Sequence, residues 1–119
     1  MDKAAILMKS GAIEPVVPAK HRNTDTWILV KPALTDNTQC EFYITEMKQG
    51  GGADWDEHPG CEHIYFVMAG RARMWVEDEE FALEPGDCLL MREGARHKVD
   101  VVGSETFRIA VVFAPGRLP

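Results

Sequence analysis

The feature of this sequence that most constrains its fold is a series of short β-rich runs separated by turn residues. Gly50-Gly51-Gly52, Gly70 and Pro85-Gly86 mark breaks between runs, and Pro85-Gly86 suits the middle of a type II turn. No stretch after residue 24 has the 3.6-residue periodicity of an amphipathic helix. Short strands punctuated in this way predict an all-β sandwich or barrel. The runs are TWILVKPAL, CEFYITEMK, HIYFVMA, RARMWVE, FALE, DCLLMRE, HKVDVV and TFRIAVVFA.

The chain is long enough for one hydrophobic core but not for two. It has 119 residues, and 45% of them are hydrophobic. Residues 1–24 are mixed in character and contain Pro15 and Pro18, so we expect an N-terminal arm or edge strand there. We expect residues 25–119 to form a single β-barrel domain.

Charge and hydropathy exclude several classes of partner. The formal net charge is −6, which argues against a surface that binds the phosphates of DNA or RNA. The apolar runs are too short to cross a membrane, and the N-terminal one is too short for a secretory signal. Cys40, Cys61 and Cys88 have no paired spacing, so the simplest expectation is a reduced, cytoplasmic protein with free thiols.

Potential metal ligands precede one apolar run and begin another. Asp56, His58 and His63 lie just before or at the start of the run HIYFVMA. In RHKVDVV, alternation gives His97 the same face as two valines, so its side chain is predicted to point inward. A single inward histidine is more often a core residue than a ligand. Together, however, imidazoles and a carboxylate suit a divalent transition metal.

The spacing of these residues resembles the first motif of the cupin superfamily. That motif is glycine, five residues, His-x-His, three or four residues, glutamate, six residues and glycine. This chain has Gly50, five residues, Asp56, one residue, His58, four residues, His63, six residues and Gly70. The motif's first histidine is therefore replaced by aspartate, and its glutamate by histidine.

A second stretch resembles the second cupin motif. That motif is glycine, five residues, Pro-x-Gly, two residues, histidine, three residues and asparagine. Here Gly86 is followed by five residues, Arg92-Glu93-Gly94, two residues and His97, with Val101 at the asparagine position. The resemblance implies a jelly-roll β-barrel, also called a double-stranded β-helix.

The replacements in the first motif preserve the ligand inventory. Cupins usually use three histidines and one glutamate, and this chain offers three histidines and one aspartate. The resemblance therefore implies one divalent transition metal, of the group Fe, Mn, Ni, Zn and Co, held by Asp56, His58, His63 and His97. Random substitution in a site that no longer binds metal would not be expected to give three histidines and one carboxylate again.

Other side chains are weaker candidates for a role in the site. Tyr65 shares a face with His63 and is a candidate to hold a substrate oxygen or relay a proton, although plain packing explains it equally well. Arg108 could anchor an anionic substrate, but a solvent-facing arginine is the simpler expectation. Glu62 could substitute as a ligand if the preceding loop is irregular.

Three further residues are expected to be structural. Cys61 and Cys88 are interpreted as free thiols rather than ligands. His21, beside an arginine in the arm, is expected to be a surface residue.

The resemblance leaves two functional hypotheses. The cupin scaffold carries dioxygenases, lyases, isomerases, decarboxylases, sugar-binding proteins and storage proteins, so the fold does not choose among them. One hypothesis is a metal-dependent enzyme of lyase, isomerase or dioxygenase type that binds and activates an oxygen-rich small molecule. The other is a non-catalytic domain that binds or senses a small ligand.

The strand HIYFVMA is apolar on both faces, which predicts that both are covered. The run IAVVF near the C-terminus has the same character. Single-barrel cupins commonly dimerise through a sheet face, so we expect a homodimer. The alternative is that the N-terminal arm covers this surface within one chain.

Overall fold

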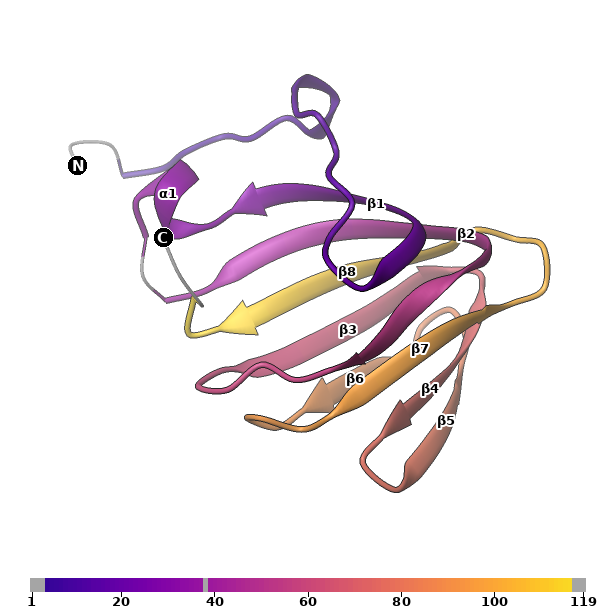
Figure 1. The fold of residues 1–119 in the computed structure, drawn as a ribbon. Helices are drawn as coiled ribbons and strands as arrows, with labels where there is room; N and C mark the ends of the chain where they lie inside the picture. The colour runs from indigo at the N-terminus through magenta and orange to yellow at the C-terminus, as the bar shows by residue number, and fades with distance from the viewer. Residues whose placement is uncertain (1–3, 38, 117–119) are drawn as a thin grey trace.

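The computed structural model describes residues 4–37 and 39–116, and its regular secondary structure is almost entirely antiparallel strands (Figure 1). A single helical turn, η1, lies in the arm, and the only other helix of the described residues is four residues long. None of the helices in these ranges is long and apolar enough to cross a membrane. The elements are η1 (Ser10–Ala12), β1 (His21–Val30), α1 (Pro32–Thr35), β2 (Glu41–Asp56), β3 (Glu62–Ala69), β4 (Arg71–Val76), β5 (Glu79–Leu83), β6 (Cys88–Met91), β7 (His97–Val102) and β8 (Phe107–Ala114).

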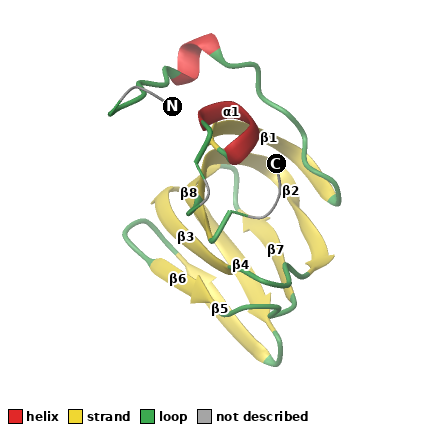
Figure 2. Cartoon of the chain, turned by 90° about the vertical axis from the view of Figure 1, so that its left-hand side faces the viewer, coloured by secondary structure: helices red, strands yellow, loops and turns green. Residues whose placement is uncertain are grey.

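The strands form one curled sheet with the order β5-β4-β7-β2-β8-β3-β6, and β1 pairs with β2. The sheet folds over on itself, so that β3, β8 and β1 face β7, β4 and β5 across the interior (Figures 1 and 2). This confirms the predicted all-β jelly-roll barrel. Alternation along the strands fills the interior with apolar side chains, of which the most deeply buried are Met47, Val67, Met74, Met91, Val99, Phe107 and Ile109.

The long strand β2 belongs to both halves of the barrel. Its first part, from Glu41 to Met47, pairs with β8, and its last part, from Gly52 to Asp56, pairs with β7. Gly50 and Gly52 have φ of 78° and 153°, and a Cβ on Gly52 would lie 2.2 Å from the carbonyl oxygen of Val99. The glycine triplet therefore bends a continuous strand, and the prediction that it interrupts the chain was wrong.

The first predicted run also differs from the structure. The sequence favoured one strand through TWILVKPAL, but β1 ends at Val30 and Pro32 begins the helix α1. Proline lacks the N–H that a central strand would use, and its fixed φ suits the first turn of a helix. Upstream, β1 already begins at His21, while the predicted division between arm and barrel after residue 24 stays a prediction.

Candidate metal centre

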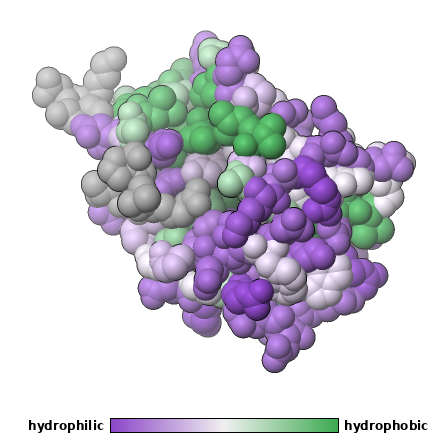
Figure 3. Space-filling model, viewed as in Figure 1, coloured by the Kyte–Doolittle hydropathy of each residue, from purple (hydrophilic) through white to green (hydrophobic). Residues whose placement is uncertain are grey.

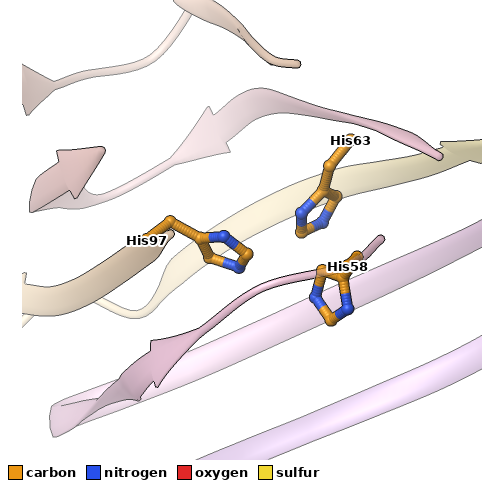
Figure 4. Close-up of side chains that lie close together, drawn as sticks. All are labelled: His58, His63 and His97. Atoms are coloured by element: carbon orange, nitrogen blue, oxygen red, sulfur yellow. The ribbon is translucent and has the colours of Figure 1, made fainter. Parts of the chain in front are cut away.

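Three strand ends converge at one mouth of the barrel and bring three histidines together. His63 is the second residue of β3, His97 is the first of β7, and His58 lies two residues after the end of β2. Asp56 pairs with His97 in the β2–β7 register, which brings the end of β2 beside the start of β7. Figure 4 shows the three imidazole rings pointing toward one another from separate segments.

The imidazole cluster, defined as His58, His63 and His97, has the donor set of a transition-metal site. One ring nitrogen from each histidine lies within 4.8 Å of those of the other two. Two nitrogens bound to the same zinc ion at about 2.1 Å would be at most about 4.2 Å apart, so small ring rotations suffice to close the cluster on an ion. The fit is good for ions that accept imidazole ligands, such as Zn, Fe, Ni, Co or Cu.

The surroundings of His97 favour a neutral ring with Nε2 available. Its Nδ1 lies 3.1 Å from the carbonyl oxygen of Ala95, which can only accept, so Nδ1 carries the proton and donates. Burial lowers the pKa of His97, against the opposing effects of the Ala95 hydrogen bond and the charge of Asp56. A neutral imidazole is the form that binds metal.

Aromatic packing fixes the orientation of His63. Its ring stacks on Phe113 with centroids 4.1 Å apart, and the ring of Tyr65 meets it edge-on at 4.9 Å. Both His63 and His97 are only 5% exposed. Because these rings are held by packing, the cluster is largely preorganised and does not depend on a mobile loop for two of its three members.

Asp56 borders the imidazole cluster but is not one of the three converging groups. Its Oδ1 lies 3.3 Å from Nζ of Lys20 and accepts the backbone N–H of Glu57 at 2.9 Å, while its Oδ2 is 3.9 Å from Nε2 of His58. Partial burial would raise the pKa of Asp56, but the Glu57 hydrogen bond, His58 and Lys20 outweigh it and lower the pKa. The carboxylate is thus charged and close, and its direct ligation of a metal stays a prediction.

Tyr65 is buried on the inward face of β3, and it shares this face with His63, as the alternation predicted. Burial, with a smaller contribution from the charge of Asp56, raises the pKa of Tyr65. The side chain is therefore a neutral phenol at neutral pH, suited to hydrogen bonding rather than to ionisation. A catalytic role for Tyr65 stays a prediction.

The weaker candidates lie apart from the imidazole cluster. Glu62 is exposed and its carboxylate is 4.0 Å from the guanidinium of Arg92. Cys61 is buried, but its Sγ lies 3.7 Å from the carbonyl oxygen of His58, and Cys88 is exposed on β6. Arg108 is exposed and pairs with Glu46 at 3.1 Å.

A cavity of about 240 Å³ adjoins the cluster, and the sequence interpretation missed one of its residues. His21 lines this cavity and is only partly exposed, whereas the sequence indicated a plain surface residue. Its partner in the β2 register is Ala53, which also lines the cavity. A register shift between Arg22 and Thr24, with Asn23 at φ 48°, reverses the face on which His21 lies. A simple alternation pattern contains no signal for such a bulge.

Comparison with known proteins agrees with this architecture. The family model described as a cupin domain matches residues 43–113, more than half of the chain. The polyketide synthase CurC of Streptomyces cyaneus is 24% identical over 103 residues, which are 87% of this chain and 67% of that protein.

Two solved structures share the fold at low sequence identity. A predicted oxalate decarboxylase from Thermotoga maritima superposes with a TM-score of 0.81 at 16% identity, covering 92% of this chain and 99% of that one. The polyketide cyclase RemF from Streptomyces resistomycificus superposes with a TM-score of 0.81 at 17% identity, covering 97% and 82%.

Proposed function

The chain belongs to the cupin domain family, and on that basis we propose that it is a small metal-dependent enzyme acting on an oxygen-rich small molecule. The observation that carries the proposal is the imidazole cluster, whose three rings converge beside a cavity large enough for a ligand. The proposed ligands of the ion are His58, His63 and His97, with Asp56 as a fourth.

A divalent ion held at this cluster would supply Lewis acidity toward a carbonyl or enol oxygen of the substrate. The protein's own contribution is to orient the rings, through the Ala95 carbonyl at His97 and the Phe113 ring at His63, while burial favours the neutral form of His97. Tyr65, a neutral phenol that lines the same cavity, is proposed to hydrogen-bond a substrate oxygen. The reaction class proposed is a lyase, isomerase or dioxygenase.

The relatives support a substrate rich in carbonyl groups. CurC is a polyketide synthase protein, and RemF is a polyketide cyclase. Polyketide chains carry carbonyl groups that enolise readily, which is the chemistry that a Lewis acid promotes. We therefore favour an enolisable carbonyl compound over other oxygen-rich molecules.

The proposal includes a homodimer in the cytoplasm, with residues 25–119 as the catalytic barrel and residues 1–24 as an arm. Support for a reducing compartment comes from Cys40 and Cys88, which are free thiols. Support for a dimer comes from the outer face of β3 and β6, where Phe66 is 44% and Leu90 46% exposed.

The test follows exchange of the α-hydrogens of a 1,3-diketone, such as 1,3-cyclohexanedione, with deuterium from the solvent by NMR. Oxygen uptake is recorded in parallel. We expect the protein with its metal restored to accelerate exchange or oxygen uptake, and we expect His63→Gln to abolish the acceleration. His21→Gln is the matched control, because it changes a cavity histidine outside the imidazole cluster.

Tight binding of the diketone without any turnover, in protein that does contain metal, would favour the non-catalytic ligand-binding alternative. Equal rates in the wild type and in His63→Gln would overturn the proposed role of the cluster.

A further inference from the structure

A turn at the end of the N-terminal arm borders the cavity beside the imidazole cluster. Pro18 and Ala19 line the cavity, and the backbone N–H of His21 closes the turn by donating to the carbonyl oxygen of Pro18 at 3.3 Å. The carbonyl oxygen of Lys20 accepts the backbone N–H of Asp54 at 3.0 Å. The four residues from Pro18 to His21, called the mouth turn below, therefore attach the arm to the end of β2 at one border of the cavity.

Lys20, the third residue of the mouth turn, has a backbone conformation that lysine rarely adopts. Its φ is 65°, and the third residue of a β-turn with positive φ is usually glycine or asparagine. A lysine there stores backbone strain, which persists only where other contacts hold the residue in place. The side chain is 53% exposed, so packing in the core does not explain the choice of lysine.

The contacts that hold Lys20 are made by its ammonium group. The Nζ atom lies 3.3 Å from Oδ1 of Asp56 and donates to the carbonyl oxygen of Trp55 at 3.4 Å. The other carboxylate oxygen of Asp56 lies 3.9 Å from Nε2 of His58. Because Asp56 is the proposed fourth ligand, a cation of the protein itself already pairs with the carboxylate that a metal ion would use.

Charge makes the ammonium group and a metal ion competitors for this carboxylate. Asp56 is the only acidic residue among the described residues that line the cavity, and Lys20 balances its charge. With an ion bound, one carboxylate would carry two cations, and like charges at such short range repel each other. The exposed ammonium group can leave the carboxylate for water, whereas the buried rings of His63 and His97 keep their places.

We propose that Lys20 is a positioning residue of the metal site, which holds Asp56 until the carboxylate turns to a metal ion, and that its release loosens the mouth turn. The inference rests on the proposed function, because it takes Asp56 as the fourth ligand. Once the ammonium group leaves, the side chain no longer holds the strained backbone, and the turn relaxes. Since Pro18 and Ala19 line the cavity, ion binding in this way opens one border of the cavity to a substrate.

Zinc affinity, measured by competition with a chelating dye, tests the competition for Asp56. We expect Lys20→Met to tighten zinc binding about three- to fivefold, which is the upper part of what an exposed ion pair contributes, and Lys20→Arg to stay near the wild type. Lys98→Met is the matched control, because Lys98 follows His97 in the chain but pairs with Asp100. An equal gain in Lys20→Met and Lys98→Met would overturn the inference.

The same substitution in an Asp56→Asn background shows whether Lys20 acts through Asp56. We expect Lys20→Met to tighten zinc binding only where the carboxylate is present, because an asparagine offers no charge for which the two cations compete. A gain of the same size in both backgrounds would overturn the role assigned to Lys20.

Amide hydrogen exchange measures the mouth turn itself and does not depend on activity. The N–H groups of His21 and Asp54 are the probes, because they donate to the carbonyl oxygens of Pro18 and Lys20. In the wild type zinc should make both exchange faster, and in Lys20→Met they should exchange fast with or without zinc. Lys20→Gly removes the ammonium group together with the strain, so it should exchange more slowly than Lys20→Met. Exchange that zinc slows or leaves unchanged in the wild type would overturn the loosening.

Zinc content of the same samples separates this inference from the proposed function. A wild type that binds zinc, with an affinity and exchange rates that Lys20→Met leaves unchanged, would reject the role of Lys20 and leave the proposed metal site standing. A wild type that takes up no zinc would reject both.

Discussion

At the scale of single residues, Asp56 has two competing partners. Its carboxylate lies 3.3 Å from Lys20 and 3.9 Å from His58, so the residue either pairs with the lysine or turns toward an ion at the cluster. A ligand carboxylate would partly neutralise the ion and hold it more firmly, whereas a neighbouring carboxylate would only orient His58.

We predict that Asp56→Asn lowers metal affinity by roughly tenfold or more, because it keeps the size of the side chain and removes its charge. Competitive titration against a chelating dye measures the change. Glu57→Gln is the matched control, since it removes the neighbouring exposed carboxylate without touching the cluster. If Asp56→Asn and Glu57→Gln lowered metal affinity equally, only the general charge of the loop would matter.

The lowered pKa of His97 predicts acid sensitivity of the metal-free protein. Burial depresses the pKa in the folded state below the value of about 6.5 for an unfolded chain. Below pH 6.5 the unfolded chain therefore binds the proton first, and the free energy of unfolding falls by at most about 1.4 kcal/mol per pH unit from this group. Above pH 6.5, titration of His97 does not change the free energy of unfolding. Urea unfolding between pH 7.5 and 5.5 should show a shallower decline in His97→Gln, and an equal decline would contradict the argument.

At the scale of strands and turns, alternation predicted most of what the structure contains. His97 points inward as the pattern of its strand required, and Tyr65 lies on the same face of its strand as His63, as alternation predicted. The pattern could not predict the bend of β2 at Gly50 and Gly52, because glycine permits a turn and a bent strand alike. Nor could it predict the bulge that turns His21 inward, because a one-residue shift in register does not show in the amino-acid composition.

Gly70, between β3 and β4, should tolerate no side chain. Its φ is 76°, and a Cβ there would lie 2.4 Å from the carbonyl oxygen of Thr106 and 2.7 Å from Cα of Phe107. Strain and overlap together should make Gly70→Ala about 2–5 kcal/mol less stable. Gly103 has φ of 82° but open space around it, so Gly103→Ala should cost only about 1–2 kcal/mol. Urea denaturation measures the free energy of unfolding of both variants, and equal losses in Gly70→Ala and Gly103→Ala would exclude the overlap at Gly70.

At the scale of the whole molecule, two apolar surfaces stay exposed. Figure 3 shows apolar side chains gathered in the upper part of the view, where Figure 1 has the arm and β1, and the arm contributes Ile6, Leu7, Val16 and Val17. The arm pairs with β1 through Val16 and Thr26, while Phe66 of β3 remains exposed. The alternative in which the arm covers β3 within one chain is therefore not what the structure contains.

We predict that the chain is a dimer and that Phe66→Glu shifts it to monomer, because a charge at a buried interface is costly. Light scattering at micromolar concentration measures the mass. Val102→Glu, at an apolar residue of β7 with a similar exposure of 47%, should leave the mass unchanged. A wild-type mass of one chain would refute the dimer.

The account as a whole depends on the imidazole cluster being a metal site, and metal analysis tests this directly. Elemental analysis of protein purified without added metal, compared between the wild type and a His58→Ala, His97→Ala double variant, measures occupancy per chain. We predict about one divalent transition ion per chain in the wild type and essentially none in the double variant, with both proteins folded by circular dichroism. Full occupancy in the double variant, or no uptake by wild-type protein even when a divalent ion is supplied, would contradict the account.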